Sequence, residues 1–173
     1  STSYSIIQRH GGCLTAESEE GKGSTFRIHL PASGSEPDAE YAGSGMVLSA
    51  NKRALLMDDE ELILQVGAQM LGHLGIETEC ARDGKEAIDL FRKAKEAGSP
   101  FDIVIMDLTI PAGMGGKEAI TELLRIDPSV KAVVSSGYSN DPVISSYRKY
   151  GFSAFIIKPY KIEDLSAALQ PLL

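Results

Sequence analysis

Residues 46–173 alternate short apolar runs with amphipathic stretches, and this alternation restricts the fold more than any other feature of the chain. In the first amphipathic stretch Leu62, Val66, Met70 and Leu74 recur at helical spacing before Gly75. Continuous apolar strands that alternate with helices predict a parallel sheet covered on both faces. The predicted strands lie at residues 54–57, 77–80, 101–106, 131–135 and 154–157, and the later helices include residues 142–150 and 162–172.

Composition divides the chain before this pattern begins. Residues 31–45 read PASGSEPDAEYAGSG, without periodicity, which predicts a flexible linker. The residues before it are too few to bury a core by themselves. We therefore expect an incomplete N-terminal segment at residues 1–31, a linker at residues 32–51 and an α/β domain at residues 52–173.

Charge and cysteine content exclude several classes of function. The chain carries 17 Lys and Arg against 24 Asp and Glu, a net charge of -7, so no basic surface for nucleic acid or an anionic membrane is expected. Its apolar runs are too short to span a bilayer. Cys13 and Cys80 form no metal-ligand pair, which favours reduced thiols in a cytoplasmic protein, and a disulfide between them stays open. The start at Ser1, without Met or a targeting segment, leads us to expect a piece of a longer protein.

Polar side chains follow four of the five predicted strands. Because ligands of a doubly wound sheet bind at the carboxyl ends of its strands, these residues are the candidates for function. Converging carboxylates repel one another, and a hard cation with oxygen ligands, such as Mg²⁺, relieves the repulsion. Taken singly, each residue is more often a turn former or a helix cap. Together they favour phosphoryl transfer to an aspartate. In strand order they are Asp58 and Asp59, then Asp107, then Ser135 and Ser136, then Lys158.

Residues 52–173 resemble the receiver domain of bacterial two-component response regulators. The resemblance rests on Asp58-Asp59-Glu60, on Asp107 with Pro111 four residues later, and on Ser136-Gly137 and Lys158-Pro159. It implies a flavodoxin-like doubly wound fold of five βα units with strand order 2-1-3-4-5. The chain departs from the family's pattern in the loop at residues 110–116, which is one residue longer and lacks an Asp, and in Tyr160, where Phe is commoner.

The same resemblance implies a role for each site residue. Asp107 would accept the phosphoryl group, and Lys158 and Ser136 would assist. Phosphorylation would switch the surface formed by the fourth helix, fifth strand and fifth helix. The implied Mg²⁺ ligands are Asp58, Asp59, Asp107 and the backbone carbonyl of Thr109; the implied switch residues are Ser136 and Phe155; the residues implied to modulate phosphoryl lifetime are Thr109 and Tyr138.

The N-terminal segment has a signature of its own. Residues 14–18 and the alternating Phe26, Ile28 and Leu30 predict two strands around Gly21-Lys22-Gly23, and residues 3–10 predict a short helix. A glycine-rich hairpin turn is the simplest interpretation. The stretch also resembles the end of a histidine kinase catalytic domain, with Gly21 and Gly23 from its second glycine box. This implies a hybrid sensor kinase whose other ATP-binding parts precede Ser1, so this chain is not expected to bind ATP.

Three functions stay open at this point. The first is a phosphorelay receiver that takes a phosphoryl group from phosphohistidine, on its own kinase or on a histidine phosphotransfer protein, and the resemblance leaves open whether the chain forms a homodimer. The second is a receiver-like docking module without phosphorylation. The third is a metal-dependent phosphatase, which would want a second Asp two residues after the nucleophile, where this chain has Thr109.

Overall fold

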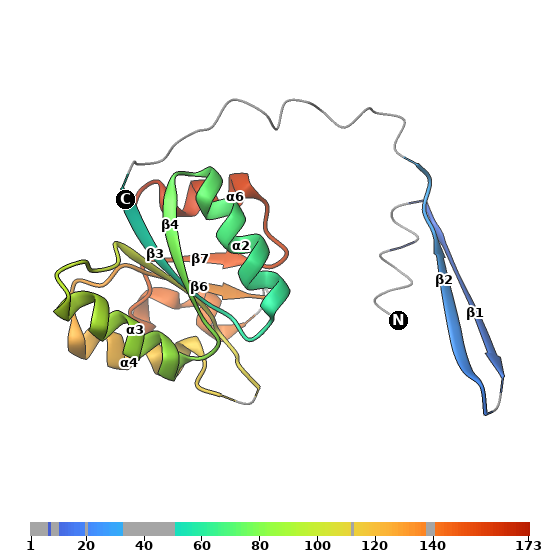
Figure 1. The fold of residues 1–173 in the computed structure, drawn as a ribbon, viewed down its shortest axis with the longest axis horizontal. Helices are drawn as coiled ribbons and strands as arrows, with labels where there is room; N and C mark the ends of the chain where they lie inside the picture. Colours follow the sequence, from blue (N-terminus) through green and yellow to red (C-terminus); the bar gives the residue numbers. More distant parts are fainter. Residues whose placement is uncertain (1–6, 8–10, 20, 33–50, 112, 138–140) are drawn as a thin grey trace. The chain divides into compact units, whose positions relative to one another are not determined.

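The computed structural model describes residues 7, 11–19, 21–32, 51–111, 113–137 and 141–173 (Figure 1). The chain divides into two compact units, Ser1–Ser44 and Gly45–Leu173. All but the ends of the predicted linker, and all but Ile7 of the helix predicted at residues 3–10, lie outside the described residues.

The larger unit contains one five-stranded sheet in which every neighbouring pair of strands is parallel. The order β4-β3-β5-β6-β7 is the predicted order 2-1-3-4-5, counted from the first strand of this unit. The predicted flavodoxin-like architecture is therefore confirmed. The strands are β3 (Lys52–Met57), β4 (Ile76–Ala81), β5 (Ile103–Asp107), β6 (Ala132–Ser136) and β7 (Ala154–Ile157).

Helices cover both faces of this sheet (Figure 1). Side chains of α3, α4 and α5 pack in one apolar cluster, and those of α2 and α6 pack in a second cluster on the other face. No helix in the described part of the chain combines the length and the apolar character needed to cross a membrane. The helices are α2 (Glu61–His73), α3 (Gly84–Glu96), α4 (Gly116–Ile126), α5 (Pro142–Ser145), the 3-10 helix η2 (Tyr147–Tyr150) and α6 (Ile162–Leu169).

The prediction of one helix over residues 142–150 is wrong, because the structure has α5 and η2 in its place. Asp141 caps α5 by accepting a hydrogen bond from the backbone N–H of Val143 at 2.7 Å. The turn then ends at Ser146, whose φ of -133° is not helical. Two β-branched residues followed by two serines have low helix propensity, so the local sequence does not sustain a longer α-helix.

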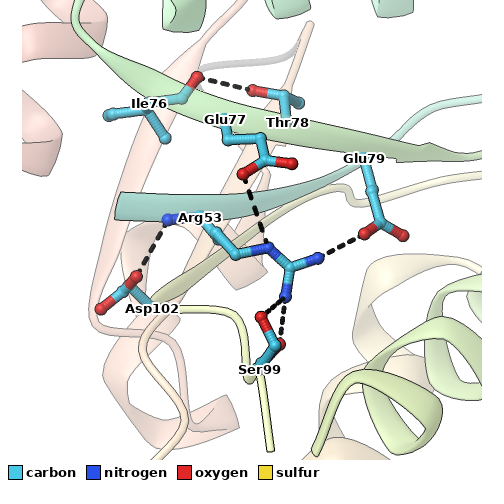
Figure 2. Close-up of polar contacts among 7 residues, drawn as sticks. All are labelled: Arg53, Ile76, Glu77, Thr78, Glu79, Ser99 and Asp102. Atoms are coloured by element: carbon cyan, nitrogen blue, oxygen red, sulfur yellow. Dashed lines mark hydrogen bonds and ion pairs between the residues drawn. The ribbon is translucent and has the colours of Figure 1, made fainter. Parts of the chain in front are cut away.

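A polar network ties the strands together at the end of the sheet where they begin (Figure 2). The Arg53 guanidinium donates to Glu79 on β4 and to Ser99, which precedes β5. The backbone N–H of Arg53 donates to the Asp102 carboxylate at 2.9 Å, and the Lys52 ammonium donates to the same carboxylate at 2.8 Å. These contacts fix the start of β3 against both of its neighbours.

The N-terminal unit contains an antiparallel hairpin, as predicted, made of β1 (Cys13–Glu19) and β2 (Gly23–His29). Gly21 and Gly23 have φ values of 79° and 96°, a backbone conformation that favours glycine. The hairpin therefore explains both glycines without a nucleotide. Its exposed large apolar side chains include Phe26, Ile28 and Leu30.

Candidate functional site

The candidate site lies where the strands of the sheet end. Asp58 directly follows β3, and its backbone N–H donates to Ala81 at the end of β4 at 3.0 Å. Asp107 is the last residue of β5. The backbone N–H of Lys158, just after β7, donates to Ser136 at the end of β6 at 2.8 Å. Backbone pairing therefore places these strand ends at one edge of the sheet.

Three carboxylates converge there, as the sequence predicts. Asp58, Asp59 and Asp107 each offer one oxygen, and these oxygens all lie within 4.8 Å of one another. The Asp58 side chain is only 2% exposed, and its Oδ1 accepts a hydrogen bond from the backbone N–H of Glu60 at 3.0 Å. Asp59 is exposed. One carboxylate is thus fixed inside the protein while another faces solvent.

Lys158 supplies the positive charge at this cluster. Its ammonium donates to Asp58 and lies 3.2 Å from Oδ2 of Asp107, and its side chain is 13% exposed. Because one partly buried lysine contacts two carboxylates, it offsets part of their mutual repulsion.

Burial and neighbouring charges shift the pKa values of both partners. Burial raises the pKa of the Asp107 carboxyl; the charge of Lys158 opposes this shift, and the charge of Asp58 adds to it. Burial alone would lower the pKa of the Lys158 ammonium, but its hydrogen bond to Asp58 and both carboxylate charges outweigh burial and raise it. Asp107 is therefore a more basic carboxylate than a free aspartate, beside a firmly protonated lysine.

The other predicted site residues that the structure describes lie on β6, on β7 or just after β5. Ser136 is buried at the end of β6. Thr109 is exposed and lines a cavity of about 570 Å³ together with residues of α4 and α5. Phe155 on β7 is 43% exposed, and its ring centroid lies 5.3 Å from that of Tyr147 on η2. Tyr138 lies outside the described residues, so its modulating role stays a prediction.

The sequence named Ser135 as a strand-end candidate and Tyr160 as a departure from the family pattern, but it did not indicate the surroundings of either side chain. The hydroxyl oxygen of Ser135 is buried and has no hydrogen-bond partner among the described residues. The hydroxyl of Tyr160 reaches α2 beside Gly67, where an added Cβ would lie 3.4 Å from it. Burial raises the Tyr160 pKa, and the charge of Lys158 opposes that shift. The two-residue period of a strand would have separated Ser135 from Ser136, whereas nothing in the sequence indicated the approach of Tyr160 to α2.

The donor atoms of the acid cluster fit a hard divalent cation. All three side chains offer carboxylate oxygens, the ligands that Mg²⁺ prefers. No other group of three such metal-ligating side chains occurs within the described parts of the chain. The Lys158 ammonium supplies one positive charge to this cluster of three carboxylates.

The fold and the acid cluster define a receiver-type signalling domain. A family model described as the response regulator receiver domain matches residues 54–170. This chain belongs to that family.

Relatives and solved structures agree with this assignment. The sensor kinase CckA of Brucella abortus is 30% identical over 179 residues, which cover 98% of this chain and 18% of CckA. The chemotaxis protein CheY of Thermotoga maritima is 32% identical over 126 residues, 68% of this chain and 94% of CheY. A structure of the receiver domain of sensor histidine kinase PA1611 from Pseudomonas aeruginosa PAO1, with a magnesium ion in its active-site cleft, is 22% identical. It shares the fold at a TM-score of 0.62 over 71% of this chain and 98% of that domain.

Proposed function

We propose that this receiver domain accepts a phosphoryl group from phosphohistidine on Asp107. One observation carries the proposal: three carboxylate oxygens lie within 4.8 Å of one another, and the Lys158 ammonium contacts two of the three carboxylates. A purely structural cluster would not need to gather so much negative charge at an edge of the sheet.

The transfer would form an oxygen–phosphorus bond and break a nitrogen–phosphorus bond. A carboxylate oxygen of Asp107 attacks the phosphorus, and the departing histidine nitrogen keeps the electron pair of the broken bond. Burial makes the Asp107 carboxylate more basic, which favours its attack. Lys158, whose ammonium lies 3.2 Å from that carboxylate, would contact the oxygens of the incoming group.

Mg²⁺ is the proposed cofactor. Asp58, Asp59 and Asp107 would hold it with their side chains, and Thr109 with its backbone carbonyl. When bound, it would supply charge neutralisation for the phosphoryl oxygens. The hydrogen bond from the Glu60 N–H orients the Asp58 carboxylate, which supports this proposal.

We propose that phosphorylation is read at the surface formed by α5 with η2, β7 and α6. Phe155 packs against Tyr147 of η2 there, and Ser136 lies at the end of the adjacent strand β6. Thr109 and Tyr138 would adjust how long the phosphoryl group persists. Tyr138→Ala tests the second of these roles, and an unchanged dephosphorylation rate would remove Tyr138 from the proposal.

The whole protein is proposed to be a cytoplasmic or membrane-anchored hybrid sensor histidine kinase. The alignment with CckA supports this origin because it covers 98% of the chain, including the hairpin. The phosphoryl donor would then be the histidine of the protein's own kinase core or of a histidine phosphotransfer protein.

The proposal is tested by incubating the chain with acetyl phosphate, a small phosphodonor, and MgCl₂, then measuring its intact mass. We expect one addition of about 80 Da, the mass of a phosphoryl group. The addition should not form when EDTA replaces MgCl₂ in the incubation, nor in the variant Asp107→Asn. Asp89→Asn, which changes an exposed carboxylate on α3, is the control and keeps the addition. No addition to the wild-type chain would favour a docking module, and turnover of many phosphomonoesters would favour a phosphatase.

A further inference from the structure

Ser135 lies on the same face of the sheet as the acceptor and the lysine. Successive side chains of a strand point to opposite faces. On β6, Val134 packs in the cluster with α3 and α4, and Val133 packs in the cluster with α2 and α6. Ser135 therefore shares the face of Val133. The same alternation on β5 and β7 places Asp107 and Lys158 on this face as well.

The side chain of Lys158 crosses β6 to reach the acid cluster. Lys158 follows β7, whereas its ammonium lies 3.2 Å from Asp107 on β5, and β6 runs between these two strands. On β6 the register partner of Asp107 is Ser135. Because paired strands lie about 4.8 Å apart, Ser135 stands beside the path of the ammonium. A small side chain at this position leaves room for the lysine stem.

Burying the hydroxyl of Ser135 lowers the stability of the resting fold, and no contact that the structure describes in the resting site compensates for this. The residue is 3% exposed, and within the described parts of the chain its hydroxyl oxygen has no hydrogen-bond partner. A buried hydroxyl without a partner destabilises a fold, and alanine would fill the same space without that penalty. The penalty would be explained by a second arrangement of the site in which the Ser135 hydroxyl gains a hydrogen-bond partner.

We propose that Ser135 is a positioning residue that accepts a hydrogen bond from the Lys158 ammonium when a divalent cation takes over the Asp58 carboxylate. The inference rests on the proposed function. A cation on Asp58 competes with Lys158, which donates to that same carboxylate. The ammonium would then keep only its contact with Asp107, and losing one of two partners inside a protein is unfavourable. The Ser135 hydroxyl supplies a replacement acceptor on the same face.

A titration of the phosphate-free chain with MgCl₂ alone, followed by amide chemical shifts in NMR, tests this role. We expect Ser135→Ala to weaken Mg²⁺ binding by about 3- to 10-fold, the value of one hydrogen bond. Ser166→Ala is the matched control, because Ser166 on α6 is also buried and its hydroxyl also lacks a partner in the part of the chain that the structure describes. We expect unchanged Mg²⁺ affinity in that control. Both variants should unfold at the same temperature as the wild-type chain or higher, so impaired folding would not explain a loss of affinity.

A double-mutant cycle separates positioning of Lys158 from a general effect of Ser135. In a Lys158→Ala background the ammonium is gone, so adding Ser135→Ala should leave Mg²⁺ affinity unchanged. Equal Mg²⁺ affinity in the wild-type chain and Ser135→Ala, or an equal loss in the Lys158→Ala background, would overturn the inference while the proposed function stands. A wild-type chain that neither binds Mg²⁺ nor takes up a phosphoryl group would overturn both.

Discussion

Replacing Arg53 with methionine removes a charged group from the network at the start of β3 while keeping most of its stem. The Arg53 side chain is 19% exposed, and its guanidinium donates to Glu79 and Ser99 (Figure 2). The same group lies 4.7 Å from the ring centroid of Phe101. Arg53→Met therefore loses an ion pair, hydrogen bonds to Ser99 and a cation–π contact in one step.

The expected loss of stability follows from these contacts. A partly exposed ion pair is worth up to about 1 kcal/mol, a net hydrogen bond about 1 kcal/mol and a cation–π contact about 0.5–1 kcal/mol. The sum of these contacts predicts that Arg53→Met lowers the free energy of unfolding by about 2–3 kcal/mol. The loss should not be larger, because water can reach the Ser99 acceptors after the change. The acid cluster lies at the other end of the strands, so phosphorylation by acetyl phosphate below the melting temperature should not change.

Urea unfolding followed by circular dichroism measures this loss. Arg125→Met is the control, because Arg125 forms a surface ion pair with Glu122 and is 68% exposed. We expect the control to change the free energy of unfolding by less than about 0.5 kcal/mol. If Arg53→Met changes it no more than the control does, the assignment of stability to this network is refuted.

Three further predictions follow from the helices and the acid cluster. Hydrogen bonds, chiefly from Ser129, lower the Asp127 pKa to about 2; Asp127→Asn should therefore cost at most about 1 kcal/mol at pH 7. The difference in the free energy of unfolding between the wild-type chain and Asp127→Asn, measured in urea, should vanish as the pH falls from about 4 towards 2. The stabilisation is complete above the pKa of Asp127 in the unfolded chain and is lost as the pH falls through its pKa in the folded chain. Gly67→Ala should lower the melting temperature, because the new Cβ would lie 2.7 Å from a core leucine. At Gly72 a new Cβ would meet no described atom within 4 Å, so Gly72→Ala should raise the melting temperature and add up to about 1 kcal/mol to the free energy of unfolding. Lys158→Ala leaves carboxylates unpaired, so Mg²⁺ should raise its melting temperature by more than it raises that of the wild-type chain; an equal or smaller rise would contradict the charge argument.

The sequence was sufficient where each residue's role depends on its own strand. The strands β3, β5 and β7 contain continuous apolar runs in the sequence. The positions of Asp58, Asp107 and Lys158 at the ends of these strands could therefore be predicted. The strand order followed from the family resemblance.

Contacts between distant segments could not be predicted in the same way. Lys158 and Asp58 are 100 residues apart, and their hydrogen bond depends on the stem crossing a strand. The break between α5 and η2 falls at Ser146; the low local helix propensity is compatible with a break there, but the apolar pattern did not fix its position. The unpartnered hydroxyl of Ser135 likewise requires knowledge of every neighbouring atom.

Locating the phosphoryl group on the chain tests the central claim most directly. Borohydride reduces an aspartyl phosphate to homoserine, so the wild-type chain can be phosphorylated, reduced, digested and sequenced by mass spectrometry. We expect homoserine at position 107 and nowhere else, with none in a sample treated with EDTA. Homoserine at position 58 or 59, or a phosphoryl group retained on another side chain while Asp107 stays intact, would contradict the assignment of Asp107 as the acceptor.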